Sequence, residues 1–437
     1  MKMLKQLISL DNPFRLLYHK SRAIIANIYY GFPSKKMIII GVTGTNGKTT
    51  TSNIIAKGLR DAGKKVFMFS TVNIIINDSE YTNNTKMTSP DAFELQRLLK
   101  LAKNEGCEIA VIETASHGIK MHRVRGIDYD VSVLTNITQD HLDLHKTMKD
   151  YVNTKLQIFK HLIGYKRKPG IKKTAVINSE SDYKELFLAE TYDSMFVYGN
   201  GDKSNLKAIN VVNDINGMSF DIEVAGPNIH IDTHFIGSFN ISNILAAVGV
   251  FISFGIESDM IPKMIKNITG VPGRLDEVLN NKENFKVFID YAHTPDALEK
   301  VLETLSDING RKRIITVFGA TGDRDKTKRP IMGEIVSRLS DIVILTQDDD
   351  YTEKTEDIIK DVLPGIERKE SEDFWIITNR KEAITTALLM AEENDIVLIA
   401  GKGDEHMLIT NKGPVEWHDK AVVNEILKGI DDNKILK

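Results

Sequence analysis

The chain has 437 residues, which is more than one hydrophobic core usually holds, so we expect two or three domains. The formal net charge of −3 gives no electrostatic argument for a nucleic-acid partner. The single cysteine, Cys107, excludes an intramolecular disulfide and a cysteine metal cluster. We find neither an apolar run of roughly 18 residues, as a membrane-spanning helix requires, nor a signal-peptide pattern. A cytoplasmic protein is therefore expected.

The first predicted element is a helix over residues 13–31. Asn12 is a suitable cap, Pro13 suits the first helical position and Gly31 suits the end. One face of this helix carries the apolar side chains of Leu17, Ile24, Ile25 and Ile28. Charge is supplied by the basic side chains of Arg15, His19, Lys20 and Arg22. This pattern fits a basic helix on a membrane surface or a helix docked on the body of the protein. We favour docking.

The next segments alternate between strand-like and helix-like patterns. Residues 37–42 form a short β-branched run, and a Gly-rich turn and a helical stretch at 49–62 follow it. Further strands are expected at 65–69, 108–112, 130–134 and 174–177, with helices at 91–104 and 148–162. Such alternation is typical of an α/β domain with a largely parallel sheet.

The second half of the chain predicts another, smaller α/β domain. Residues 196–236 suggest a local antiparallel sheet, a helix follows at 239–254, and glycine and proline at 269–274 mark a boundary. Strands then recur at 285–290, 313–318, 341–346, 373–377 and 395–400. We therefore predict a helical segment at 1–36, a central domain at 37–269 and a C-terminal domain at 270–437.

The turn from Thr43 to Thr50 reads Thr-Gly-Thr-Asn-Gly-Lys-Thr-Thr and lies between a predicted strand and a predicted helix. This context suits a phosphate-binding loop, because glycines let backbone N–H groups approach phosphate oxygens at a helix N-terminus. Lys48 would face the β- and γ-phosphates, and Thr49 could offer its hydroxyl to Mg²⁺. The strict phosphate-loop pattern is not met, since Val42 stands where the first glycine belongs.

A divalent-ion site is predicted at the same edge of the sheet. Glu113 ends one strand and His141 follows the next, and ligands collect at the carboxyl edge of parallel sheets. Mg²⁺ needs few protein ligands there. The alternative, that His141 and Asp143 only cap a helix, stays open. On the residues alone, Lys155 is a solvated lysine on a helix face.

Seven motifs, spread in order over about residues 37–420, together resemble the Mur ligase family. They are TGTNGKTT (43–50), ETASHG (113–118), TNITQDHLDLH (135–145), GSFNISNILAA (237–247), GVPGRLDEV (270–278), DYAHTPDAL (290–298) and GDRDKTKRP (322–330). Three segments, at 88–90, 322–333 and 401–405, are most similar to the MurE branch, which adds the third amino acid to UDP-MurNAc-dipeptide.

The resemblance implies a phosphate-loop ATPase domain with a mainly parallel sheet, followed by a Rossmann-like domain, and it implies residue roles. Nucleotide would be bound by Gly44, Thr45, Asn46, Gly47, Lys48, Thr49, Thr50, Asn136, Asn240, Arg274, Asp290, Tyr291 and His293. The catalytic set would be Lys48, Glu113, His141 and Lys155, and the metal ligands Thr49, Glu113, His141 and a carbamylated Lys155. The acceptor would contact Thr88, Ser89, Ser116, His117 and Arg123, and the amino acid Arg324, Asp348, Asp349, Arg380, Gly401 and Glu405.

The implied reaction uses ATP and Mg²⁺, with two ions expected. The carboxylate of the acceptor attacks the γ-phosphate, and the resulting acyl-phosphate meets the amine of the amino acid. Water must be kept from the acyl-phosphate, so closure of the C-terminal domain is expected. The resemblance therefore implies a ligase of peptidoglycan precursor synthesis, with small-molecule or peptide substrates. We expect a monomer.

Two departures from the MurE pattern narrow this expectation. Only about 36 residues precede the first strand, so the usual N-terminal UDP-binding domain is expected to be missing. Where diaminopimelate enzymes carry Asp-Asn-Pro-Arg, this chain has Asp348-Asp-Asp-Tyr351, which could attract the ammonium of lysine or ornithine, or could cap a helix near Thr352. Asp404 adds acidity where a histidine is usual, and Met121 replaces a polar residue of some members.

Two other functions stay open at this point. A Mur-type ligase could act on a lipid-linked precursor, another peptide or a poly-γ-glutamyl chain, although the related folylpolyglutamate synthetases usually read GTNGKGS in the loop. A nucleotide-binding partner subunit without catalysis is the second alternative. The set Lys48, Glu113, His141, Lys155 and Arg274 argues against it.

Overall fold

The computed structural model describes residues 12–83, 85, 87–138, 142–278 and 284–431. The chain forms two compact units. Unit 1 comprises Met1–Val211, Ser219–Thr233 and Phe239–Ile268, and unit 2 comprises Val212–Met218, His234–Ser238 and Thr269–Lys437. Among the described residues, no helix combines the length and the hydropathy needed to cross a membrane.

Unit 1 is built on a sheet with strand order β4-β3-β2-β5-β1-β6-β7-β8. From β2 to β8 all neighbours in this order are parallel, and β3 and β4 continue the edge as antiparallel strands. The strands are β1 (Ile38–Thr43), β2 (Val66–Phe69), β3 (Asn73–Ile76), β4 (Ser79–Thr82), β5 (Ile109–Glu113), β6 (Val131–Leu134), β7 (Thr174–Asn178) and β8 (Ser194–Tyr198). The predicted mainly parallel sheet is confirmed.

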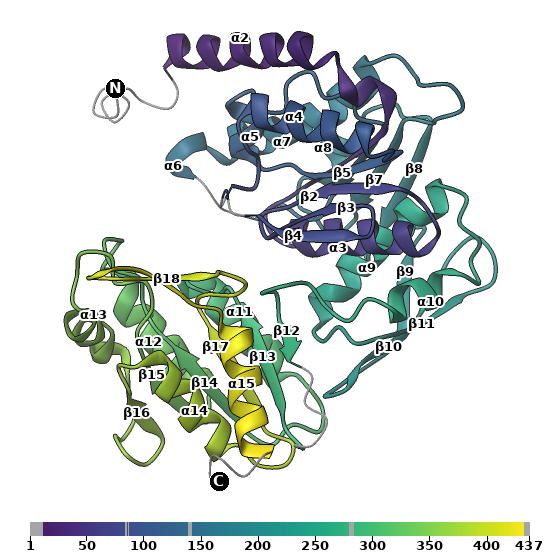
Figure 1. Ribbon diagram of the computed structural model, residues 1–437. Coiled ribbons are helices and arrows are strands. Elements are labelled where there is room, and N and C mark those ends of the chain that lie inside the picture. The colour runs from purple at the N-terminus through teal and green to yellow at the C-terminus, as the bar shows by residue number, and fades with distance from the viewer. Residues whose placement is uncertain (1–11, 84, 86, 139–141, 279–283, 432–437) are drawn as a thin grey trace. The chain divides into compact units, whose positions relative to one another are not determined.

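Helices cover both faces of this sheet (Figure 1). The face with α4, α5, α7 and α8 holds a large apolar core that includes Phe67, Leu99 and Phe159, and α3 and α9 lie on the other face. The helices are α2 (Pro13–Tyr30), α3 (Lys48–Asp61), α4 (Ala92–Asn104), α5 (Ser116–Lys120), α6 (Leu142–His145), α7 (Met148–Gly164), α8 (Lys184–Leu188), α9 (Ser238–Ser253) and α10 (Ile261–Lys266), with a 3₁₀ turn η1 at Pro33–Lys36.

The predicted N-terminal helix is confirmed as α2. The Asn12 side chain accepts hydrogen bonds from the N–H groups of Phe14 at 2.9 Å and Arg15 at 3.4 Å. Gly31 ends the helix at a φ of 71°, a conformation that costs glycine little. One face packs on α4, where Ala23 and Ala26 are buried with Ala92. The helix therefore docks on unit 1, as the preferred interpretation predicted.

A separate three-stranded sheet, with order β11-β10-β9, follows the main sheet of unit 1 in the chain. Its strands are β9 (Lys207–Asp214), β10 (Gly217–Glu223) and β11 (Ile229–Thr233). The predicted start of this sheet at residue 196 is wrong, because residues 194–198 form β8 and pair parallel with β7 in the main sheet. Phe196 and Val197 thus extend the central sheet.

Unit 2 has a sheet with order β12-β13-β17-β14-β15-β16, parallel except for β12 at its edge. Its elements are β12 (Asp276–Val278), β13 (Lys286–Asp290), α11 (Pro295–Ser306), β14 (Ile314–Phe318), α12 (Lys328–Leu339), β15 (Ile342–Leu345), α13 (Thr355–Val362), η2 (Leu363–Gly365), β16 (Phe374–Ile376), α14 (Arg380–Met390), β17 (Ile396–Ala400), β18 (Met407–Thr410), β19 (Gly413–Glu416) and α15 (Asp419–Asp431). Unit 2 has two apolar cores. One contains apolar residues of α11, α12 and α13, and the other contains apolar residues of α14 and α15. The predicted second α/β fold is confirmed.

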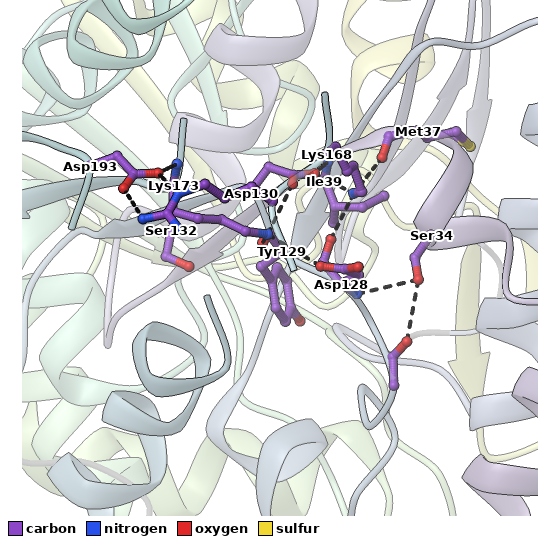
Figure 2. Close-up of polar contacts among 12 residues, drawn as sticks. Ser34, Met37, Ile39, Asp128, Tyr129, Asp130, Ser132, Lys168, Lys173 and Asp193 are labelled. Atoms are coloured by element: carbon purple, nitrogen blue, oxygen red, sulfur yellow. Dashed lines mark hydrogen bonds and ion pairs between the residues drawn. The ribbon is translucent and has the colours of Figure 1, made fainter. Parts of the chain in front are cut away.

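A buried group of charges holds β1 and β6 together at the amino end of the sheet (Figure 2). Asp130 is fully buried and accepts a hydrogen bond from the Ile39 N–H at 2.9 Å, while its own N–H donates to the Ile39 carbonyl at 2.8 Å. Lys168 and Lys173 both form ion pairs with its carboxylate. The Lys168 ammonium also donates to the Met37 carbonyl at 2.7 Å, just before β1.

Asp130→Asn should lower the free energy of unfolding by about 3–5 kcal/mol, because it leaves the buried Lys173 and the partly buried Lys168 without their shared anion. Urea denaturation of the variant and the wild type would measure this. Glu94→Gln, which breaks the exposed Arg97–Glu94 pair, is the control and should cost less than about 1 kcal/mol. Equal losses in the two variants would contradict a structural role for the buried group.

Candidate active site

The Gly-rich loop follows β1 in the middle of the sheet, between β5 and β6. Two glycines are required by close packing. A Cβ on Gly44 would lie 1.8 Å from the Thr135 hydroxyl oxygen, and a Cβ on Gly47 would lie 2.4 Å from Asn243 Oδ1. Both glycines also have φ values in the left-handed region, 154° and 79°. Any larger residue would therefore change the shape of the loop.

The segment after β6 holds the loop backbone in place. The N–H of Thr45 donates to the Asn136 carbonyl at 2.9 Å, and the N–H of Asn46 donates to Asn136 Oδ1 at 2.8 Å. The Thr135 hydroxyl donates to the Asn46 carbonyl at 2.6 Å. Asn136, which was predicted as a nucleotide residue, is thus in direct contact with the loop.

The helix α3 starts directly after the loop. Gly47 occupies the cap position and provides no side chain to the first-turn N–H groups, which makes this terminus suitable for an anion. The Lys48 ammonium donates to the Thr45 carbonyl at 2.7 Å, so it lies over the loop. On α9, Asn240 and Asn243 are buried and hydrogen-bonded to each other at 2.9 Å.

Glu113 ends β5 beside the start of α3, as predicted. Its carboxylate is 1% exposed and accepts hydrogen bonds from the Thr49 hydroxyl at 3.1 Å and from the Thr71 N–H at 2.7 Å. The Thr71 hydroxyl donates to the same carboxylate at 3.0 Å and lies 2.8 Å from the Thr88 hydroxyl. A carboxylate and a hydroxyl this close form an all-oxygen donor set, which suits Mg²⁺.

His141, one of the predicted metal ligands, lies outside the described residues. Lys155, on α7, is 1% exposed, and its ammonium donates to the Gly44 carbonyl at 2.5 Å. It also lies 4.4 Å from the centre of the Tyr151 ring. The interpretation of Lys155 as a solvated lysine is therefore wrong, because the folding of α7 against the loop buries it.

The residues predicted for the acceptor lie together around the ends of β2 and β5. The Ser89 hydroxyl accepts from the Ala115 N–H at 3.3 Å, and Arg123 donates to the Ser89 carbonyl at 2.8 Å. Ser116 is buried, and its hydroxyl has no hydrogen-bond partner among the described residues. His117 follows it on the first turn of α5. A substrate could satisfy this hydroxyl.

A buried histidine, His145, lies behind this region. Its side chain is fully buried, its ring contacts those of Tyr151 and His117, and Nε2 has no hydrogen-bond partner among the described residues. Burial, together with the nearby charge of Lys120, lowers the pKa of the imidazole to about 4. At neutral pH this histidine is therefore uncharged.

In unit 2, the residues predicted for the nucleotide cluster after β13. Asp290 accepts hydrogen bonds from the N–H groups of Leu275 at 2.7 Å and Ala292 at 2.8 Å. The Arg274 guanidinium lies 5.2 Å from the centre of the Tyr291 ring, which packs on His293. Burial raises the pKa of Asp290 and lowers the pKa of His293. The cluster therefore combines one cation with two ring surfaces.

The three consecutive aspartates after β15 are all buried. Asp349 accepts hydrogen bonds from the Lys402 ammonium at 2.7 Å and the Ile409 N–H at 2.8 Å. Asp348 Oδ2 and Asp350 Oδ1 have no hydrogen-bond partner among the described residues. Burial raises the pKa of both Asp348 and Asp350.

The aspartates do not cap a helix, because α13 begins only at Thr355 with Lys354 as its cap. The alternative that placed a helix start near Thr352 is therefore wrong. Two of their carboxylate oxygens thus have no hydrogen-bond partner among the described residues.

The other residues predicted for the amino acid differ in their surroundings. Arg380 is buried and forms a two-bond ion pair with Asp419, at 2.9 and 2.7 Å, so most of its donors are engaged inside the unit. Arg324 lies 5.4 Å from the centre of the Tyr351 ring. Glu405 accepts from Lys402 at 2.6 Å, and Gly401 packs against Asp348, since a Cβ there would lie 2.4 Å from Asp348 Oδ2. Arg380 also donates to the Gln347 carbonyl at 3.2 Å, one residue before the aspartates.

Sequence reasoning missed Thr71, Asn243 and His145. Thr71 follows a strand, as Glu113 does, so its position at the carboxyl edge was a usable signal. Asn243 is one of two buried amides on α9, and it accepts from the Thr51 hydroxyl at 3.1 Å. His145 carried no comparable signal, since its burial depends on α7.

Comparison with known families and proteins gives consistent matches. Residues 42–251 match the Mur ligase middle domain, and residues 273–403 match the glutamate ligase domain of Mur ligases. The UDP-N-acetylmuramoyl-L-alanyl-D-glutamate–2,6-diaminopimelate ligase 1 of Clostridium acetobutylicum is 37% identical over 94% of this chain and 82% of its own length. The ligase of the same name from Bacillus cereus is 37% identical over 98% of this chain and 86% of its own.

Solved structures show the same fold. A UDP-N-acetylmuramoyl-L-alanyl-D-glutamate–2,6-diaminopimelate ligase has a TM-score of 0.68 and 29% identity, over 90% of this chain and 79% of that one. The folylpolyglutamate synthase of Mycobacterium tuberculosis, complexed with ADP, has a TM-score of 0.66 and 19% identity, over 87% of this chain and 91% of that one.

His145 should make the stability of the protein dependent on pH between about 6.5 and 4. The unfolded imidazole takes up a proton near its usual pKa of 6.5, whereas the folded one stays neutral down to about 4. Its stabilising contribution is therefore complete above pH 6.5 and is lost as the pH falls through this window.

Urea unfolding at pH 7.5 and 4.5 should show that His145→Gln removes on the order of 2 kcal/mol of this pH dependence. His234→Gln, at an exposed histidine, is the control and should keep the wild-type slope. If the unfolding free energy of His145→Gln depends on pH as strongly as that of the wild type, the assignment of this pH dependence to His145 is contradicted.

Proposed function

This chain belongs to the Mur ligase family, and from that premise we propose that it joins an amino acid to the terminal carboxylate of UDP-MurNAc-dipeptide. Members of this family are ATP-dependent ligases, and so is this protein. The observation that carries the proposal is the contact between Thr49 and Glu113 beside the phosphate loop. This contact supports the proposal because it leaves oxygen donors at the start of α3, beside the loop that would hold the γ-phosphate of a bound ATP.

The phosphate loop and Lys48 would bind the triphosphate of ATP. The first-turn N–H groups of α3 and the Lys48 ammonium would neutralise charge as the γ-phosphoryl group moves to the acceptor carboxylate. Thr49 and Glu113 would hold Mg²⁺, which when bound withdraws charge from the phosphate oxygens. His141 is proposed as a further ligand on the resemblance alone.

Lys155 is proposed to carry a carbamate. The carbamate keeps one N–H on the side-chain nitrogen, so the hydrogen bond to the Gly44 carbonyl can persist. The modification would turn a buried cation into an anion, which removes one positive charge from the neighbourhood of Lys48 and supplies oxygen donors for a metal ion. Burial on α7 would shield the labile group from water.

The acceptor would lie along Thr88, Ser89, Ser116, His117 and Arg123. The Arg123 guanidinium is held by the Ser89 carbonyl, so its charge lies at a defined place for an acceptor carboxylate. Thr71 joins this group to Glu113 through its hydroxyl. A carboxylate bound here would be next to the phosphate loop, as direct attack on the γ-phosphate requires.

We propose that the incoming amino acid carries a side-chain ammonium. Asp348 Oδ2 and Asp350 Oδ1 are buried oxygens that such a group could contact. Diaminopimelate, which the names of the relatives state as substrate, has this ammonium together with a distal carboxylate. Lysine and ornithine have the ammonium alone, and Tyr351 offers no positive charge for a second carboxylate.

Thr49→Val should reduce ligase activity by about 10–100-fold and raise the Mg²⁺ concentration needed for half-maximal rate, since the hydroxyl beside Glu113 is lost. Phosphate release from ATP, titrated with Mg²⁺, would measure both effects. Ser52→Ala removes another buried hydroxyl of α3, one with no partner among the described residues, and is the matched control. Similar kinetics in the two variants would contradict the metal role of Thr49.

An amino-acid panel with UDP-MurNAc-dipeptide, ATP and Mg²⁺ should give a product of the expected mass only with diaminopimelate, lysine or ornithine. Asp350→Asn should lower the preference for these over alanine by about tenfold, because a charged partner becomes neutral. Asp357→Asn, at an exposed position of α13, should leave it unchanged. Preference for a neutral or acidic amino acid would contradict the proposal. If no amino acid is joined to UDP-MurNAc-dipeptide, the proposed ligase activity would have to use another acceptor.

A further inference from the structure

The helix α2 presents an apolar face to solvent. Figure 1 shows this helix beside α4, at the border of unit 1. Seven large apolar or aromatic residues of the helix are at least 45% exposed, namely Phe14, Leu17, Tyr18, Ile24, Ile25, Ile28 and Tyr29. At 100° per residue they fall within an arc of roughly 140°. We call these seven residues the α2 stripe.

The stripe reverses the usual arrangement of a surface helix. Such a helix normally turns its apolar face to the core and its polar face to water. Here the small residues Ala23 and Ala26 face α4, and the large ones face outward. Arg22 fastens the helix through an ion pair with Asp91 at 2.7 Å and through contact with the Phe93 ring. The helix is therefore held in place without using the stripe.

The charged side chains of α2 and η1 are all basic, and Arg22 among them is paired with Asp91. Residues 12–60 contain no Asp or Glu. Arg15 and Arg22 lie on one side of the stripe and Lys20 on the other, and Lys35 and Lys36 follow in η1, where both are exposed. This local excess contrasts with the net charge of −3 for the whole chain. A partner for this face should thus be apolar at its centre and anionic around it.

A recess beside the stripe has the same character. A cavity of about 170 Å³ has Ile24, Phe32, Arg125 and His161 among its lining residues. Burial lowers the pKa of His161, so Arg125 is the cation of this recess at neutral pH. An aliphatic wall next to an arginine suits an anionic headgroup on an acyl surface.

We propose that the α2 stripe docks this protein on an anionic lipid surface. The helix would lie in the plane of the interface, with the stripe among acyl chains and the basic residues at the level of the headgroups. A second copy of the chain fits less well, since its stripe has the same basic residues beside it and no acidic side chain on the helix to pair with them. Binding to lipid is separate from the ligase reaction, which can be assayed with water-soluble substrates.

The full-length protein should co-sediment with phosphatidylglycerol-containing vesicles at low salt and much less with pure phosphatidylcholine vesicles. Binding should fall at least about tenfold in 0.5 M NaCl, because the basic residues are screened. The double variant Ile25→Ser/Ile28→Ser should lose at least about tenfold in vesicle affinity and keep wild-type ligase rates. Both side chains are more than half exposed, so folding should not suffer.

Val211→Ser/Val212→Ser, at exposed apolar residues of β9, is the matched control and should bind vesicles like the wild type. No binding of the wild type to anionic vesicles would overturn the proposal, as would equal binding of the stripe variant. If the wild type and the control variant form a dimer in sedimentation velocity and the stripe variant does not, the stripe would be a contact surface for a second copy of the chain instead. Loss of ligase activity without loss of binding would bear on the proposed function and not on this surface.

Discussion

The register between β1 and β6 is the constraint on which the ATP-binding unit depends. At the amino end of the sheet, Asp130 accepts from the Ile39 N–H and forms ion pairs with Lys168 and Lys173. At the carboxyl end, Thr135 donates from its N–H to the Thr43 carbonyl at 2.9 Å. A slip of one residue would turn the side chains of one strand to the opposite face. The buried charges therefore also fix where the loop after β1 meets the segment after β6.

This register collects side chains of distant origin at one edge. Glu113 comes from β5, Thr71 from the end of β2, Thr49 from α3 and Lys155 from α7. None of the four lies within 20 residues of another in the sequence. Parallel strands bring them together because all their carboxyl ends point the same way. In unit 2 the same rule places Asp290 at the end of β13 and Asp348 after β15.

The parts of the structure that could be predicted from sequence are those governed by local rules. The cap of α2 at Asn12, its end at Gly31 and the turn from Gly44 to Lys48 depend on neighbouring residues only. The path of β8 was not predictable in this way, because alternation in residues 194–198 does not reveal which sheet the strand joins.

The surroundings of side chains were harder to predict than the elements that carry them. Lys155 looked solvated because its helix pattern does not show that the face bearing it meets the Gly44 carbonyl. The pairing of Arg380 with Asp419 joins residues from two helices that are 39 positions apart. Family resemblance placed both residues at a site, but only the three-dimensional contacts show that Arg380 donates to the Gln347 carbonyl, one residue before the aspartates.

Three of the side chains that frame the phosphate loop cannot change their charge. Asn136, Asn243 and Thr135, which contact the loop, carry amides and a hydroxyl. Lys155, which donates to the Gly44 carbonyl, is an ionisable side chain among the contacts with the loop. Any acidity profile of catalysis should then report on Lys155, on the bound phosphates and on the carboxylates that face them, while the amide and hydroxyl contacts keep a constant charge.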